Sequence, residues 1–163
     1  MSDPDRLDIE MSGGCQCGAV RFHASALMAN PHICHCRMCQ KATGQLMVAA
    51  VGVREEHLVW TRGAPTIFMS SDYAERGFCP HCGTTLSFHF KGARHWAMAM
   101  GAFDEPWRIP IHFQIGTEGR HPALADLNGI RDAGTTEAAD PAGAERIRLS
   151  SHQHPDHDTE FWP

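Results

Sequence analysis

The residues of this sequence best suited to chemistry are its seven cysteines. Three of them form a C-x-C-x2-C run in "PHICHCRMCQKATG", namely Cys34, Cys36 and Cys39. The others lie in "GGCQCGAVRF" and "FCPHCGTTL", as the pairs Cys15 with Cys17 and Cys79 with Cys82. An odd number of cysteines cannot all form disulfides, and these spacings are typical of metal ligands in a reducing compartment. We therefore interpret the cysteines as thiolate ligands.

The two outer pairs can together close one zinc site. In C-P-x-C-G a tight turn directs the sulfurs of Cys79 and Cys82 at one ion, and Gly83 can adopt the positive φ that ends the turn. Cys15 and Cys17 are two residues apart in an extended segment and point to the same side. Four thiolates make a closed, structural site whose metal-binding free energy contributes to folding. The alternative is four reduced cysteines in the core.

The middle run then offers three ligands and an exchangeable position, which is the pattern of catalytic zinc sites. His32, a distant histidine or the C-terminal tail could add a fourth ligand, whereas His35 would point away from the sulfurs in extended chain. Three thiolates leave the ion with a net negative shell that favours a further sulfur ligand. A thiol bound there is deprotonated at neutral pH and becomes a nucleophile or leaving group.

Most of the elements that would position these cysteines are predicted to be strands. In "TLSFHF", alternation places Leu86, Phe88 and Phe90 on one face, and in "HWAMAM" it places Trp96, Met98 and Met100 on one face. The loop "KGARH" between them suits a hairpin. The other predicted strands are "AVRFHA", "LMVAAVGV", "HLVW" and "TIFM". Short helices are predicted only after Cys36 and in "PALADLNGI".

The length of 163 residues, 42% of them hydrophobic, predicts a single domain. We expect a flexible N-terminus at 1–11, a zinc-binding domain at 12–132, and a tail at 133–163 that is partly flexible or draped over the domain. The net charge of −5 does not favour nucleic acid or an anionic membrane as partner. With no secretory pattern and no apolar span, the expected location is cytoplasmic.

A second motif lies in the tail, where "HQHPDHD" contains His152, His154, Asp156 and His157. This H-x-H-x-D-H run occurs in the metallo-β-lactamase superfamily, but that fold needs a long downstream chain that does not follow here. The tail is therefore interpreted as polar. The alternatives are that one of its histidines reaches a neighbouring metal site or binds metal adventitiously.

The motifs "GGCQCGAVRF", "CHCRMCQKATG", "WTRGAP", "SSDYAERGFCPHCGTTL" and "MGAFDEP" occur in an order that resembles the glutathione-dependent formaldehyde-activating enzyme (Gfa) family. This family shares its domain with centromere protein V, and the resemblance covers residues 12–116. It implies a mainly β fold of the β-tent (Mss4-like) type. It also implies a structural zinc on Cys15, Cys17, Cys79 and Cys82, and a catalytic zinc on Cys34, Cys36 and Cys39. Because three ligands hold the catalytic zinc, that site could be labile and found empty.

The activity that the resemblance implies is that of a carbon–sulfur lyase, which joins glutathione and formaldehyde to S-hydroxymethylglutathione or reverses this reaction. The partners would then be a small thiol and an aldehyde, and the chain could form a homo-oligomer. Arg37 and Lys41 flank the cysteine run and could bind the carboxylates of glutathione as co-substrate, or be solvated surface charges. Where many members have a Lys and then a Trp, this chain has "IGTEGRHPALADL". The alternatives are a non-catalytic thiol carrier and an interaction module.

Overall fold

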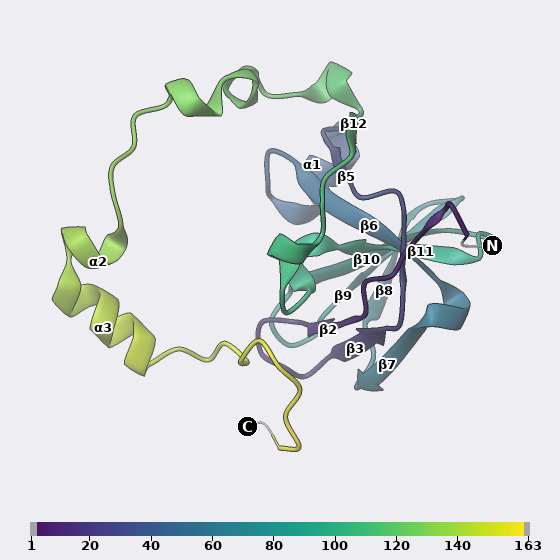
Figure 1. The fold of residues 1–163 in the computed structure, drawn as a ribbon, viewed down its shortest axis with the longest axis horizontal. Helices are drawn as coiled ribbons and strands as arrows, with labels where there is room; N and C mark the ends of the chain where they lie inside the picture. The colour runs from purple at the N-terminus through teal and green to yellow at the C-terminus, as the bar shows by residue number, and fades with distance from the viewer. Residues whose placement is uncertain (1–2, 162–163) are drawn as a thin grey trace.

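The computed structural model describes residues 3–161 and is built mainly from strands, as predicted (Figure 1). The strands are β1 (Arg6–Leu7), β2 (Met11–Gly14), β3 (Arg21–Ala24), β4 (Leu27–Met28), β5 (His32–Cys34), β6 (Val48–Arg54), β7 (Leu58–Arg62), β8 (Thr66–Ser71), β9 (Ala74–Phe78), β10 (Thr85–Phe90), β11 (His95–Ala99) and β12 (Phe113–Ile115). The α-helices are α1 (Arg37–Thr43), α2 (Thr136–Ala139) and α3 (Pro141–Leu149). The 3-10 turns are η1 (Glu55–His57), η2 (Met100–Ala102), η3 (Pro106–Arg108), η4 (Thr117–Gly119), η5 (Pro122–Ala125) and η6 (Leu127–Gly129).

The strands form three sheets. The largest has seven strands in the order β12-β5-β6-β11-β10-β9-β8, and a three-stranded sheet has the order β2-β3-β7. In the described chain, the pairing of β12 with β5 is parallel and the other strand pairs are antiparallel. A third, two-stranded sheet pairs β1 with β4. Of the N-terminal segment 1–11 that was predicted to be flexible, residues 1 and 2 lie outside the described residues.

The core lies between the two larger sheets. Phe22 of β3 is fully buried and meets the ring of Phe103 edge-on, with the ring centroids 5.0 Å apart. From the seven-stranded sheet, β6 contributes Val51 and Val53, and β11 contributes Met98. Burial of each such side chain contributes about 1.5–3 kcal/mol to folding. The prediction that Trp96, Met98 and Met100 share a core-facing side is confirmed.

The prediction that Leu86, Phe88 and Phe90 share one face is wrong. The ladder between β10 and β9 shifts register between Thr85 and Ser87, and this bulge reverses the alternation of the side chains. Leu86 therefore lies in the core, whereas Phe88 and Phe90 line a pocket on the opposite face of the sheet. The hairpin predicted between β10 and β11 is confirmed.

Helix α1 and the 3-10 turns η5 and η6 occupy the two segments that were predicted to be helical. Helices α2 and α3 were not predicted, although α3 carries a clear start signal. Its N-cap Asp140 accepts a hydrogen bond from the Gly143 N–H, and Pro141 occupies the first turn. Among the described helices, none has the length and apolar character needed to cross a bilayer.

The C-terminal part of the chain arches away from the sheets and then returns to them beside β2 and β3 (Figure 1). The returning segment is attached at a buried arginine. Arg21 is 3% exposed and donates two hydrogen bonds, of 2.8 and 2.6 Å, to the carboxylate of Asp104. It also donates to Asp158 of the tail, which accepts a 2.6 Å hydrogen bond from Ser12 as well. This cluster joins two strands, the segment after η2 and the tail.

The two acidic partners of Arg21 should contribute unequally to stability. Asp104→Ala should lower the free energy of unfolding by about 3 kcal/mol, because it leaves a buried guanidinium without its bidentate partner. Asp158→Ala should cost about 1 kcal/mol or less, because the Asp158 side chain is 56% exposed and exposed ion pairs contribute little. Urea denaturation of both variants measures the difference, and equal losses would contradict this account.

Candidate metal centres

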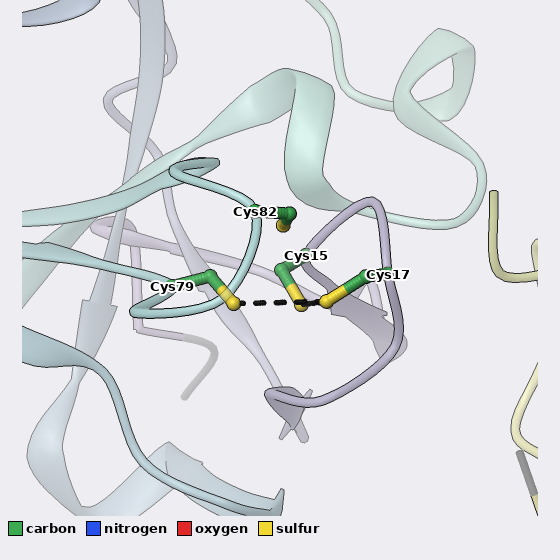
Figure 2. Close-up of side chains that lie close together, drawn as sticks. All are labelled: Cys15, Cys17, Cys79 and Cys82. Atoms are coloured by element: carbon green, nitrogen blue, oxygen red, sulfur yellow. Dashed lines mark hydrogen bonds between the residues drawn. The ribbon is translucent and has the colours of Figure 1, made fainter. Parts of the chain in front are cut away.

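Four cysteines from two distant turns meet in one cluster (Figure 2). Cys15 and Cys17 follow β2, and Cys79 and Cys82 lie between β9 and β10. The sulfur of Cys17 lies 3.6 Å from that of Cys15 and 3.8 Å from that of Cys79. All four sulfurs lie within 4.8 Å of one another. A tetrahedral ion with bonds of about 2.3 Å to sulfur needs sulfurs about 3.8 Å apart, so the cluster fits a metal of the size of zinc.

The turns that carry these cysteines are shaped by glycines and by N–H groups that point at sulfur. Gly83 has a φ of 76°, and its N–H donates to the carbonyl oxygen of Cys79 at 2.9 Å. The backbone N–H of His81 donates to the sulfur of Cys79, and that of Val20 donates to the sulfur of Cys15. Such donors stabilise the negative charge of a thiolate. The turns are therefore formed to hold anionic sulfur.

Burial and hydrogen bonds have opposite effects on the thiols of this cluster. Burial raises the pKa of Cys15 to about 12. Burial also acts to raise the pKa of Cys82, but hydrogen bonds from the hydroxyl and N–H of Thr84 outweigh it and lower this pKa to about 6. Near neutral pH the thiol of Cys15 would thus be protonated in the metal-free cluster. Metal binding would have to displace this proton.

A second cluster consists of Cys34, Cys36 and Cys39, with sulfurs within 4.8 Å of one another. Cys34 ends β5, and Cys36 is the N-cap of α1, where its sulfur accepts a hydrogen bond from the Cys39 N–H. Burial raises the pKa of Cys34 to about 12. Burial acts in the same direction on Cys36, but hydrogen bonds led by the Cys39 N–H lower the pKa of that thiol. Within residues 3–161, no further Cys, His, Asp or Glu joins this cluster.

Within residues 3–161, the histidines considered as fourth ligands do not join the cluster of Cys34, Cys36 and Cys39. The Nδ1 of His32 lies 2.8 Å from the Asn30 carbonyl oxygen, and its ring stacks on Phe113. His35 is buried, with its Nε2 2.7 Å from the side-chain oxygen of Gln114, so it turns away from the sulfurs as predicted. His154 of the tail motif donates its backbone N–H to the Gln16 carbonyl oxygen and is not part of either cysteine cluster.

A turn after β12 packs directly behind the second cluster. Gly116 has a φ of 63°, and a Cβ there would lie 2.7 Å from the backbone N of Cys36. A Cβ on Gly119 would lie 2.6 Å from the carbonyl oxygen of His35. The side-chain NH₂ of Gln40 donates to the carbonyl oxygens of both His35 and Gly119. The segment "IGTEG", which departs from the Gfa pattern, therefore supports the cysteine run.

The three cysteines open into a cavity of ≈ 500 Å³ on the face of the seven-stranded sheet turned away from the core. Arg76 of β9 borders both the cavity and the cluster, and sequence analysis did not single it out. Its Nη2 lies 3.4 Å from the sulfur of Cys39, its Nε donates to the Ser70 hydroxyl, and its guanidinium lies 4.9 Å from the centre of the Phe88 ring. One signal for Arg76 was present in the sequence. Arg76 lies two residues after Ala74 on a strand that pairs with "TLSFHF", so the side chains of Arg76 and Ala74 share one face of the sheet.

Arg76 is a buried cation that has no acidic partner among residues 3–161. It is 7% exposed, and its interactions with the described residues are with Ser70, Cys39 and Phe88. Arg37 and Lys41, the cations considered for substrate carboxylates, are exposed on α1 and line a neighbouring hollow with Phe68. The side chain of Met38 lines both spaces. The arrangement thus offers a cation beside the sulfurs and two more outside the cavity.

Replacement of Gly116 should remove metal from the second cluster alone. Gly116→Ala adds a Cβ against Cys36, whereas Gly92→Ala carries a comparable backbone penalty at a φ of 82° but meets nothing within 4 Å. We expect Gly116→Ala to lose about one equivalent of bound metal and Gly92→Ala to lose none. Mass spectrometry under native conditions counts the ions. The same metal content in both variants would show that the turn does not position Cys36.

Comparison with known proteins adds to this geometry. The family model described as glutathione-dependent formaldehyde-activating enzyme matches residues 10–117. An uncharacterized lyase of Schizosaccharomyces pombe is 30% identical over 88 residues, which are 53% of this chain and 62% of that protein. The chain thus matches less than two thirds of this relative's length. A crystal structure of a Rhodobacter sphaeroides protein has a TM-score of 0.51 at 22% identity and covers 64% of this chain and 99% of its own, which supports the fold alone.

The family match includes all seven cysteines and most of the strands that hold them. The chain belongs to the glutathione-dependent formaldehyde-activating enzyme family.

Proposed function

We propose that the protein is a zinc-dependent carbon–sulfur lyase that forms or cleaves an S-hydroxymethyl-type thiol adduct, such as S-hydroxymethylglutathione. The observation that carries this proposal is the cluster of Cys34, Cys36 and Cys39 at the wall of a cavity, with no fourth ligand among the described residues. The closed cluster of four sulfurs would hold a structural zinc. In the second cluster, zinc would supply a position at which a substrate thiol binds as thiolate.

The reaction would join the thiol sulfur to the aldehyde carbon, and Arg76 would stabilise the charge that develops on the aldehyde oxygen. In the forward direction a sulfur–carbon bond forms, the electron pair of the carbonyl π bond moves to oxygen, and the oxygen takes a proton while the thiol proton goes to solvent. The guanidinium of Arg76 lies beside Cys39 and would donate to the oxygen as its negative charge develops. The mainly apolar walls of the cavity would lower the local dielectric constant and so strengthen this interaction.

Arg37 and Lys41 would bind the carboxylates of a charged thiol such as glutathione. Both side chains are exposed and line the hollow next to the cavity, where carboxylates keep part of their hydration. A thiol bound this way would pass Met38, which lines both spaces, to reach the cysteine cluster. The charged groups would thus stay outside the apolar cavity.

The proposal is tested by the rate of adduct formation and cleavage. Because glutathione and formaldehyde combine spontaneously, the exchange rate should be measured by NMR with ¹³C-formaldehyde in the presence and absence of protein. We expect exchange above the background rate for the native protein and background exchange for Cys36→Ser. Native protein that binds glutathione without faster exchange would support the carrier alternative instead.

Arg76→Met should lower kcat by about 10²-fold or more, the usual effect of removing a donor to a developing oxyanion. Metal content and thiol affinity should stay near those of the native protein, because Arg76 is not a ligand. Arg76→Lys should recover part of the loss. Arg94→Met, at an exposed loop position, is the matched control and should keep full activity. Full activity in Arg76→Met would exclude this role.

A further inference from the structure

The cavity exists because the two central strands carry small side chains on the face that the core does not use. Ala50 pairs with Ala99, and Gly52 pairs with Ala97, across β6 and β11. These four residues face the cavity, whereas their neighbours Val51, Val53 and Met98 fill the core. The floor of the cavity is therefore formed by small residues, and the side-chain amide of Asn30 lies against Gly52. Larger side chains, among them Val48, Phe88 and Ile115, form its walls.

The cavity is much larger than formaldehyde requires. Formaldehyde has two non-hydrogen atoms, and a small molecule of that size takes up a volume comparable to the roughly 30 Å³ of a water molecule in the liquid. The cavity measures ≈ 500 Å³. With formaldehyde as the sole occupant, water would fill most of a space whose surface is mainly apolar, although Asn30, His32, Ser87 and His95 also line it. Such a surface gains free energy when an apolar group replaces the water.

The charged parts of glutathione do not suit this floor. Among the described residues that line the cavity, Arg76 is the single Lys, Arg, Asp or Glu, and it lies at the cysteine cluster. Carboxylates or an ammonium group over Ala50 and Ala97 would lose much of their hydration and gain no charged partner among the described residues there. The cations that fit them, Arg37 and Lys41, line the neighbouring hollow instead.

We infer that the adduct handled at this site carries an apolar group of several carbon atoms, which lies on the floor formed by Ala50, Gly52, Ala97 and Ala99. This inference rests on the proposed function and defines its substrate class. The apolar group can enter on the aldehyde, as an alkanal or aromatic aldehyde, or on the thiol. The chemistry recognised is the same in both cases, and the experiment separates the two sources.

The first arm keeps glutathione constant and compares formaldehyde, propanal, butanal and hexanal. The second arm keeps formaldehyde constant and compares ethanethiol, butanethiol and hexanethiol. One of the two arms varies the reactant that naturally carries the apolar group. In that arm, kcat/KM should rise about fourfold for each added methylene group, because each group is buried in the cavity. If formaldehyde with glutathione reacts as fast as every longer pair, the inference is overturned and the proposed function stands.

A variant that fills the cavity tests the location of the apolar group. Ala97→Leu should abolish the gain in kcat/KM from chain length, because its larger side chain occupies the space above the floor. Ala123→Leu, an exposed position outside the cavity, is the matched control. Metal content and circular dichroism of Ala97→Leu show whether it folds. If it does not fold, Ala99→Leu replaces it. A length preference that survives in the folded variant overturns the inference.

Binding separates the failure of this inference from the failure of the proposed function. Calorimetry with the same alkanethiols measures affinity whether or not the protein turns over. If no pair reacts but affinity rises with chain length and Ala97→Leu removes that rise, the lyase proposal fails and the inferred ligand class holds for a carrier. If the affinity for alkanethiols is independent of chain length and the aldehyde series shows no gain in kcat/KM with chain length, the inference fails.

Discussion

The fold depends on one constraint, which is that four sulfurs from two distant turns must lie within 4.8 Å of one another. One turn follows β2 of the three-stranded sheet, and the other follows β9 of the seven-stranded sheet. Holding the turns together fixes the two sheets face to face at one end, and Phe22, Val51 and Met98 fill the space between them. Four thiolates so close would repel one another without a cation. A cation bound among the four sulfurs would therefore strengthen the link between the two sheets.

The seven-stranded sheet has a different use for each of its faces. Its core face follows the usual rule that large apolar side chains are buried together. Its other face is also apolar, but the side chains at its centre are too small to fill the space above them. Alternation within β6 is therefore between large and small residues. The same strand stabilises the fold with one set of residues and lines the cavity with the other.

Sequence reasoning predicted the parts of the structure that depend on local pattern. The strands in "AVRFHA", "LMVAAVGV" and "HWAMAM" formed as expected, and the cysteines divided into clusters of four and three. The face of Phe88 was predicted wrongly, because a bulge depends on the partner strand and alternation alone cannot reveal it. Arg76 was missed because its closeness to Cys39 arises from β9 folding beside α1, a contact between residues 37 positions apart. Strand β12 was missed because its segment is short and pairs in parallel with β5.

The returning tail has a consequence for the covalent chain. Residues 120–150 form an arch that acts as a tether between the sheets and the segment that contains Asp158. A tether that spans the distance makes docking intramolecular and gives the tethered segment a high effective concentration at its docking site. Polar contacts that would be weak for a free peptide, such as that of Asp158 with Arg21, can then hold the tail at the sheets. Each release is local and is followed by rebinding to the same molecule, so the tail docks without having to form a strong interface of its own.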